Sequence, residues 1–291
     1  MTDIATQPMP SPLKPSAPGR SAFSLLVRTP TFLIGAGIVA FWAICAIFGT
    51  FFVPFDPLQD DVINALLPPD ADHWFGTDQL GRDVFSRVIA GSRDILTVAP
   101  LATLLGTFCG TAIGLVAGYN RGWVDEVIGR IIEAFLALPL IIVALIALVA
   151  LGPSTSTVIA VIGISFTPII ARTVRAAVIQ ERELDYVLTA QLRLEGPLHT
   201  MFVEILPNIL PPILVESTVR LGYAIFAVAT LSFLGFGIQP PSPDWGLSVA
   251  TNYGMIGGGF WWTVLFDALA IATLVVGVNL LADGIGAALR D

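Results

Sequence analysis

Six long apolar runs constrain the fold of this chain more strongly than any other feature. Each is close to the roughly 20 residues that a helix needs to cross a hydrocarbon core about 30 Å thick. Only 12% of the 291 residues are charged, whereas soluble domains carry about 25%, so a soluble globular protein is excluded. The runs are continuous rather than alternating, which favours helices over a lipid-facing barrel. The sequence therefore predicts an all-α membrane protein with six transmembrane helices.

The apolar runs divide the chain into spans and polar segments. Residues 1–30 are rich in proline and contain no apolar signal-peptide core, so we expect a disordered tail there. The segments that follow are a first transmembrane helix (31–53), an outer scaffold segment (54–92), a transmembrane core (93–285) with a polar loop (180–204), and a second tail (286–291). The six spans are expected at residues 32–53, 95–119, 127–151, 157–177, 209–234 and 260–281.

Basic residues gather on one side of this expected topology. Loops that face the cytoplasm are enriched in Lys and Arg. Only Arg82 and Arg87 fall in predicted outer segments, while Arg93 lies at a boundary and Arg220 lies within a span. The basic residues predicted to be inside are Lys14, Arg20, Arg28, Arg121, Arg130, Arg172, Arg175, Arg182, Arg193 and Arg290. The asymmetry predicts a multi-pass protein with both termini in the cytoplasm.

The residue inventory excludes several kinds of chemistry. A phosphate-binding loop needs a lysine, and the chain has only Lys14, in the predicted tail, so any ATP hydrolysis requires another chain. His73 and His199 fall on opposite sides of the predicted membrane and cannot share a metal ion. No nucleophile elbow is present, and a net charge of −8 disfavours nucleic-acid binding. We therefore expect no catalytic, cofactor-binding or metal-binding residues, and an intramembrane enzyme is remote.

Four glycines in the second span are spaced four residues apart, at Gly106, Gly110, Gly114 and Gly118. On a helix they share one face, where the backbone of a neighbouring helix can approach closely. Packing within the chain is the favoured interpretation. Contact with a second membrane subunit is the alternative.

Charged side chains within spans need partners or water, because each costs roughly 2.5–3.5 kcal/mol on the insertion scale. Glu216 and Arg220 are four residues apart and are expected to pair on one helix face. Glu133 and Asp267 lie about two turns inside their spans, close to the interface. The Glu216–Arg220 pair and Glu133 are candidates for a translocation path, with a purely structural role equally open. The alternative function is an ion-coupled secondary transporter that uses these carboxylates as a relay.

The polar loop at residues 180–204 predicts two short helices with a turn between them. The turn contains Gly196 and Pro197, and proline suits the first turn of a helix. The apolar residues of this loop predict a partner surface, because an ordered loop with exposed apolar side chains needs one.

The segment from His73 to Arg87 (HWFGTDQLGRDVFSR) resembles the signature that precedes the second span in dipeptide, oligopeptide and nickel ABC-importer permeases of the C type. Its Gly76, Gly81 and charged residues predict a turn held by charge-assisted hydrogen bonds, either purely structural or in contact with a binding protein. The signature residues are Gly76, Thr77, Asp78, Gly81, Arg82 and Asp83. Further matches are GY at 118–119, GWVD at 122–125, LPN at 206–208, LSFLG at 231–235, QPPSPDWG at 239–246 and NLLADG at 279–284.

The resemblance covers residues 32–291 and implies the type I ABC importer permease fold in a bacterial inner (plasma) membrane. It implies four kinds of partner: the lipid bilayer, a second permease subunit of the B type as heterodimer, two cytoplasmic ATPase subunits that bind ATP and Mg²⁺, and an extracytoplasmic substrate-binding protein. The substrate class stays open among dipeptides, longer peptides, nickel chelates and other small solutes.

The resemblance also assigns the polar loop as the element that couples the permease to its ATPase. The Glu-Ala-Ala of the family's loop motif aligns with Leu188, Thr189 and Ala190, so its first two residues are replaced. Its glycine aligns with Leu194 and is either lost or shifted to Gly196. The coupling residues implied are Asp185, Tyr186, Leu188, Thr189, Ala190, Leu194, Gly196 and Pro197.

Overall fold

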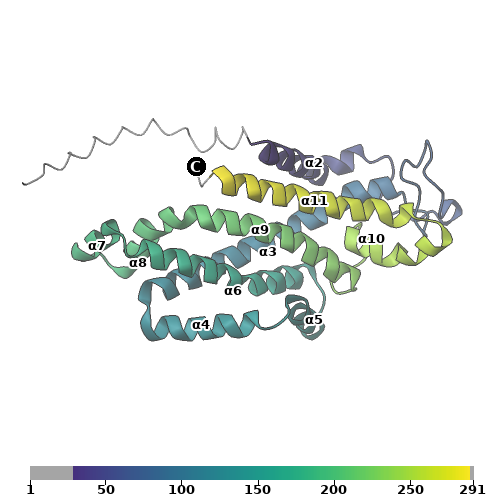
Figure 1. The fold of residues 1–291 in the computed structure, drawn as a ribbon. Helices are drawn as coiled ribbons and strands as arrows, with labels where there is room; N and C mark the ends of the chain where they lie inside the picture. Colours follow the sequence, from purple (N-terminus) through teal and green to yellow (C-terminus); the bar gives the residue numbers. More distant parts are fainter. Residues whose placement is uncertain (1–28, 289–291) are drawn as a thin grey trace, which may run out of the picture.

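A computed structural model describes residues 29–288, and its regular elements are all helical over that range (Figure 1). The long helices are α2 (Pro30–Phe52), α3 (Val84–Asn120), α6 (Thr155–Glu181), α9 (Leu206–Phe233) and α11 (Trp262–Ala288). The shorter helices are α4 (Gly122–Leu136), α5 (Leu140–Leu151), α7 (Asp185–Leu192), α8 (Pro197–His199) and α10 (Trp245–Asn252). Short 3₁₀ segments are η1 (Val62–Asn64) and η3 (Tyr253–Gly258), and η2 (Thr200–Ile205) is a short π-helical segment.

Five helices of the described chain are long and apolar enough to cross a membrane: α2, α3, α6, α11, and one continuous helix from Pro197 to Phe233. The prediction of a continuous third span at residues 127–151 is wrong. That segment is split into α4 and α5, which meet at 87°. The break falls at Pro139, whose backbone is extended, because proline has no N–H to donate and disfavours a helical residue before it. The bent pair would be the sixth span.

Two other boundaries differ from those expected. The helix α3 begins at Val84 rather than at residue 95, because the Asp83 side chain accepts a hydrogen bond from the Ser86 N–H and caps it. The helix α11 continues to Ala288. Of the predicted tails, 1–30 and 286–291, the structure describes only residues 29–30 and 286–288. The rest of both tails lies outside the described residues.

The glycine face of α3 packs against α6 within the chain. A Cβ at Gly110 would lie 2.7 Å from the Cβ of Ile170, and one at Gly114 would lie 2.6 Å from the Cβ of Val174. These separations are below any normal contact, so the two helices approach as closely as glycine allows. The favoured interpretation of the stripe, packing within the chain, is confirmed.

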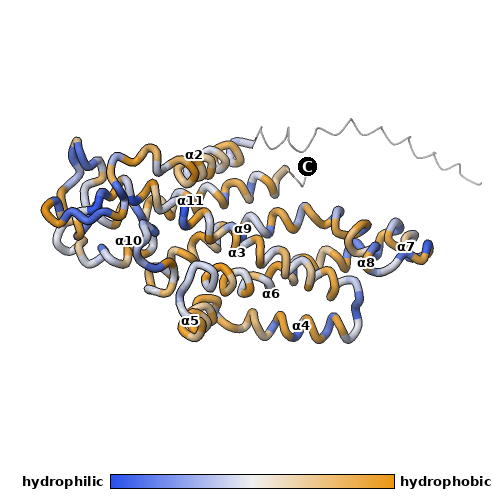
Figure 2. Tube along the Cα trace, turned by 180° about the vertical axis from the view of Figure 1, so that it is seen from behind, coloured by the Kyte–Doolittle hydropathy of each residue, from blue (hydrophilic) through white to orange (hydrophobic). Residues whose placement is uncertain are grey.

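The helices form an elongated bundle with two distinct ends (Figure 1). The α7–α8 hairpin projects at one end, while α10 and the segment before α3 cover the other. Figure 2 shows apolar residues along the length of the bundle and hydrophilic residues gathered at both ends, as a membrane protein requires. The polar residues that bear on function therefore lie at the α10 end and the α7–α8 end.

Candidate functional site

Asp78 is at the centre of a tight turn at the α10 end. Its Oδ1 accepts hydrogen bonds from the backbone N–H groups of Leu80 and Arg82, at 2.8 and 3.0 Å, and its Oδ2 accepts one from Arg82 Nε at 2.8 Å. Gly81 has φ +75°, and a Cβ there would lie 1.6 Å from the Asp61 carbonyl oxygen. Only glycine fits that position. The turn predicted from the signature, held by charge-assisted hydrogen bonds, is present.

Trp262, at the start of α11, joins this turn to the helical bundle. Its indole N–H donates to the Thr77 carbonyl oxygen at 3.2 Å. Gly76 has φ +74°, and a Cβ there would lie 2.7 Å from the Trp262 ring. The aromatic ring thus occupies the space that any larger residue at position 76 would need.

Asp83 connects the turn to α3 and to His73. It caps α3 through the Ser86 N–H at 2.8 Å, and its other oxygen lies 2.9 Å from His73 Nδ1. Thr77, Asp78 and Asp83 are all buried. These signature side chains therefore hold the segment together rather than present themselves at its surface.

Arg87, the last residue of the signature segment, is buried, which the sequence did not indicate. Its Nη1 donates to the Pro57 carbonyl oxygen at 2.9 Å, and its Nη2 donates to the Ser242 carbonyl oxygen at 3.3 Å. Its Nε lies 3.7 Å from Asp78 Oδ2. One guanidinium therefore joins the turn, the segment before it and the segment before α10.

Two buried carboxylates complete the α10 end. Asp244 caps α10 by accepting from the Leu247 N–H at 2.8 Å, and burial raises the pKa of its carboxyl to about 6. Asp267 accepts from Ser248 Oγ at 2.6 Å and is completely buried. Asp267, expected close to the membrane interface, is covered within the protein by α10. The Asp244 cap is local, to a residue three positions on, whereas the burial of Asp267 under α10 depends on tertiary contacts.

The α7–α8 hairpin has a buried face and an exposed apolar face. Val187 and Ala190 are fully buried against the bundle. The exposed apolar face, called here the docking face, consists of Leu188, Leu192, Leu194 and Leu198, of which Leu192 is 84% and Leu194 is 90% exposed. The first predicted short helix, α7, and the turn after it are present, but the second is the start of the long helix Pro197–Phe233, with Pro197 in its first turn.

Tyr186 anchors the hairpin to the long helices. Its hydroxyl donates to Glu181 Oε1 at 2.8 Å and accepts from Asn208 Nδ2 at 3.1 Å. Burial and the neighbouring Glu181 carboxylate raise the pKa of Tyr186 to about 12. The hydroxyl is thus a neutral link between the end of α6 and the start of α9. Asp185 and Thr189 lie on the exposed side of α7, where the Thr189 hydroxyl donates to the Asp185 carbonyl oxygen at 2.7 Å.

The position in the hairpin that suits a glycine is occupied by a leucine. Leu194 has φ +61°, in the left-handed region that costs a side-chain-bearing residue roughly 1–2 kcal/mol. Gly196 has an ordinary φ of −66° and open space around its Cα. The left-handed backbone that favours glycine is therefore at Leu194, and Gly196 has no geometric need for glycine.

The expected intramembrane ion pair is present. Arg220 Nε lies 2.6 Å from Glu216 Oε1, and each side chain is 18% exposed. Glu133 does not join this pair: in the described residues its ion pair is with Arg130, at 3.7 Å, and it is 71% exposed. Glu133 instead lines a polar pocket of about 310 Å³ between α4 and α6, together with Arg172.

Comparisons with known proteins identify the family. Residues 110–291 match the family described as binding-protein-dependent transport system inner membrane component. The chain belongs to this family. Residues 17–69 also match the N-terminal transmembrane domain of oligopeptide transport permease C. The resemblance to C-type ABC-importer permeases is therefore confirmed, and the chain is a permease component and a multi-pass membrane protein.

Relatives match this permease over most of its length. It is 37% identical to a dipeptide transport system permease protein DppC of Alkalihalophilus pseudofirmus, over 94% of this chain and 90% of the relative. It is 35% identical to a probable D,D-dipeptide transport system permease protein DdpC of Escherichia coli, over 90% and 87%. A solved chain of the MetNI methionine ABC transporter, in inward facing conformations, shares the fold with a TM-score of 0.58. That chain is 19% identical, over 70% of this chain and 96% of its own. The predicted ABC-permease fold is confirmed.

Proposed function

We propose that this chain is the C-type permease subunit of an ATP-driven importer of dipeptides or short peptides. It would form half of the translocation path, with a B-type permease as the other half. Two separate ATPase subunits would bind ATP and Mg²⁺, and a substrate-binding protein would deliver the peptide. The names of the relatives support the substrate class, and the family description supports the binding protein.

The docking face carries the proposed coupling to the ATPase. Its leucines are exposed on a hairpin whose opposite side is buried, so the hairpin is a rigid element that presents apolar surface. An exposed apolar patch on an ordered element indicates a protein partner. A rigid element of this kind can transmit the closure of an ATPase dimer into the membrane.

The orientation of the permease across the membrane is proposed from the distribution of its arginines. The α7–α8 end, with Arg182 and Arg193, would face the cytoplasm, as would both termini. The α10 end would then face the substrate-binding protein. Because Thr77, Asp78 and Asp83 are buried, we assign the signature to support of that face rather than to direct contact with the binding protein.

The Glu216–Arg220 pair is proposed as a polar lining of the path. Paired charges give a polar surface without an isolated charge in the membrane. An ion-coupled secondary transporter would instead need a carboxylate that is free to exchange its ion. Reconstituted uptake of a dipeptide that needs ATP and persists without an ion gradient is the expected result. Gradient-driven uptake without ATP would reject the importer assignment.

The coupling assignment is tested by recovery of the ATPase. The chain is coexpressed with the other subunits of its transporter and purified through its own affinity tag. Leu192→Asp combined with Leu198→Asp should reduce the recovered ATPase at least about tenfold, because charge replaces the apolar contact. Ile63→Asp is the matched control, since Ile63 is 95% exposed at the opposite end. Full recovery of the ATPase with the double variant would contradict the assignment.

A further inference from the structure

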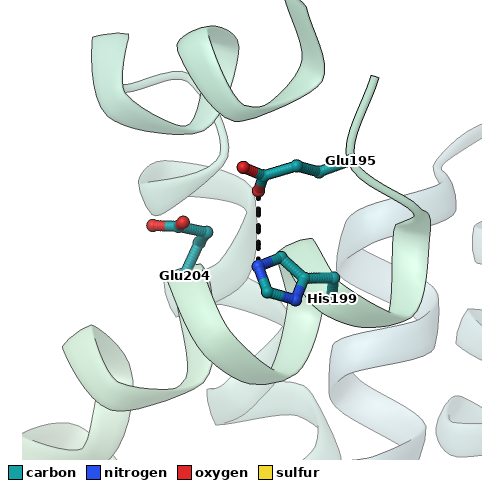
Figure 3. Close-up of side chains that lie close together, drawn as sticks. All are labelled: Glu195, His199 and Glu204. Carbon is teal, nitrogen blue, oxygen red and sulfur yellow. Dashed lines mark ion pairs between the residues drawn. The ribbon is translucent and has the colours of Figure 1, made fainter. Parts of the chain in front are cut away.

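We propose that Glu195, His199 and Glu204 form a binding site for one divalent transition-metal ion of the zinc class, at the α7–α8 end of the molecule. Their ligand atoms all lie within 4.8 Å of one another. Figure 3 shows Glu195, from the loop before α8, facing His199 of α8, with Glu204 of η2 beside them and its carboxylate directed to the side. His199 Nε2 and Glu195 Oε2 are already 3.5 Å apart, about the separation of two ligands on one tetrahedral zinc ion, roughly 3.3 Å.

The local helix geometry brings these residues together. Glu195 lies in the loop before α8, where Gly196 is extended, and this loop brings its carboxylate to within 3.5 Å of His199 Nε2. Glu204 is five positions beyond His199, and on an α-helix it would point about 140° away. The intervening turn, η2, is a π-helix, whose hydrogen bonds span five residues, so Glu204 returns to the face of His199. Single π turns are frequent at functional sites.

The hydrogen bonds around Glu195 leave one oxygen available to an ion. Its Oε1 accepts from Arg193 Nε at 2.8 Å. Its Oε2 is buried, has no hydrogen-bond partner and faces His199. A buried acceptor without a partner is costly, and a metal ion at Oε2 would satisfy it. Arg193 would keep its bond to Oε1, as outer partners of metal-binding carboxylates do, and its Nη2 lies 3.5 Å from Glu204 Oε1.

The ligand set selects the class of ion. One imidazole nitrogen with two carboxylate oxygens suits Zn²⁺ and its neighbours, whereas Ca²⁺ and Mg²⁺ prefer oxygen ligands alone. Three protein ligands leave a fourth position for water, and His199 is half-exposed, so solvent reaches the site. The ion would link the turn after α7 to the start of the long helix that contains α9. Binding itself does not depend on the proposed function.

Titration with Co²⁺ tests the site, because cobalt replaces zinc and absorbs visible light when protein-bound. The full chain is purified with a tag that contains no histidine. We expect one equivalent of Co²⁺ to give ligand-field bands, Zn²⁺ to remove them and millimolar Mg²⁺ to leave them. His199→Gln and Glu204→Gln should each abolish the bands at one equivalent.

Glu183→Gln is the matched control. Glu183 precedes the same hairpin but pairs with Arg121, outside the cluster, so this variant should bind like the unmodified chain. Gel filtration and circular dichroism verify that each variant is folded. If an isolated variant is not folded, the metal content of the assembled transporter that contains it is measured in place of the Co²⁺ titration. Absence of stoichiometric binding by the unmodified chain, or bands that survive in His199→Gln, would overturn the proposal.

Discussion

The guanidinium of Arg87 donates a hydrogen bond to the carbonyl oxygen of Ser242, 155 positions further along the chain. The same side chain reaches the Pro57 carbonyl oxygen and lies 3.7 Å from Asp78. One buried cation therefore closes the end of the bundle that we propose faces the binding protein. Its loss would leave the Pro57 and Ser242 carbonyl oxygens without this donor and Asp78 with Arg82 as its remaining cationic partner.

Arg87→Met should destabilise the chain by about 1–3 kcal/mol, because the Pro57 and Ser242 carbonyl oxygens lose their donor in a buried setting. Arg93→Met is the matched control: Arg93 lies on the same helix and is exposed, so it should change stability by no more than about 0.5 kcal/mol. Unfolding in detergent, followed by circular dichroism against added denaturant, measures both. Equal stability of the two variants would contradict the bridging role of Arg87.

Gly110→Ala should destabilise the packing of α3 on α6 by about 1–3 kcal/mol, the usual cost of overpacking. The added Cβ would lie 2.7 Å from that of Ile170. Gly129→Ala, in α4, meets open space and should instead gain up to about 1 kcal/mol from helix propensity. Unfolding in denaturant, as above, measures the stability of both variants. If the glycine stripe is a packing surface, Gly110→Ala must lower stability while Gly129→Ala does not.

The burial of Asp244 predicts a pH dependence of stability. Its folded pKa of about 6 lies above the unfolded value of 3.8, so the folded state disfavours the ionised carboxyl. The contribution of this carboxyl to stability should be largest below about pH 4, fall by up to about 3 kcal/mol between pH 4 and pH 6, and then level off.

Asp244→Asn should remove this part of the pH profile, because asparagine does not titrate and still caps a helix well. The difference between the two profiles, measured by unfolding from pH 4 to pH 8, isolates the contribution of Asp244 from that of neighbouring Asp267. Parallel profiles would show that Asp244 keeps an ordinary pKa.

Leu194→Gly should leave the hairpin more stable than Leu194→Ala by about 1 kcal/mol. Both substitutions remove the exposed side chain, but only glycine relieves the left-handed backbone at φ +61°. Hydrogen exchange of the amides in α7 and α8 should therefore be slower in the glycine variant. Faster exchange in the glycine variant would mean that the backbone conformation is not strained.

Much of the site could be predicted from short-range patterns. The turn around Asp78 and Gly81, the Glu216–Arg220 pair and the hairpin with Pro197 all depend on residues close in sequence. Pro139 was visible as well, and it breaks the third span as proline chemistry requires. Hydropathy alone did not indicate the break at Pro139, because apolar residues continue on both sides of it.

The amino-acid sequence by itself determined the helical membrane class, because long apolar runs with few charges have almost no other stable arrangement. The relation to binding-protein-dependent permeases also lay in the sequence. Only the tertiary structure decided that Arg87 meets Ser242, that α10 buries Asp267, and that a π turn brings Glu204 to His199 and Glu195. Such contacts depend on how distant helices pack and on small changes of helical pitch, which neither composition nor periodicity specifies.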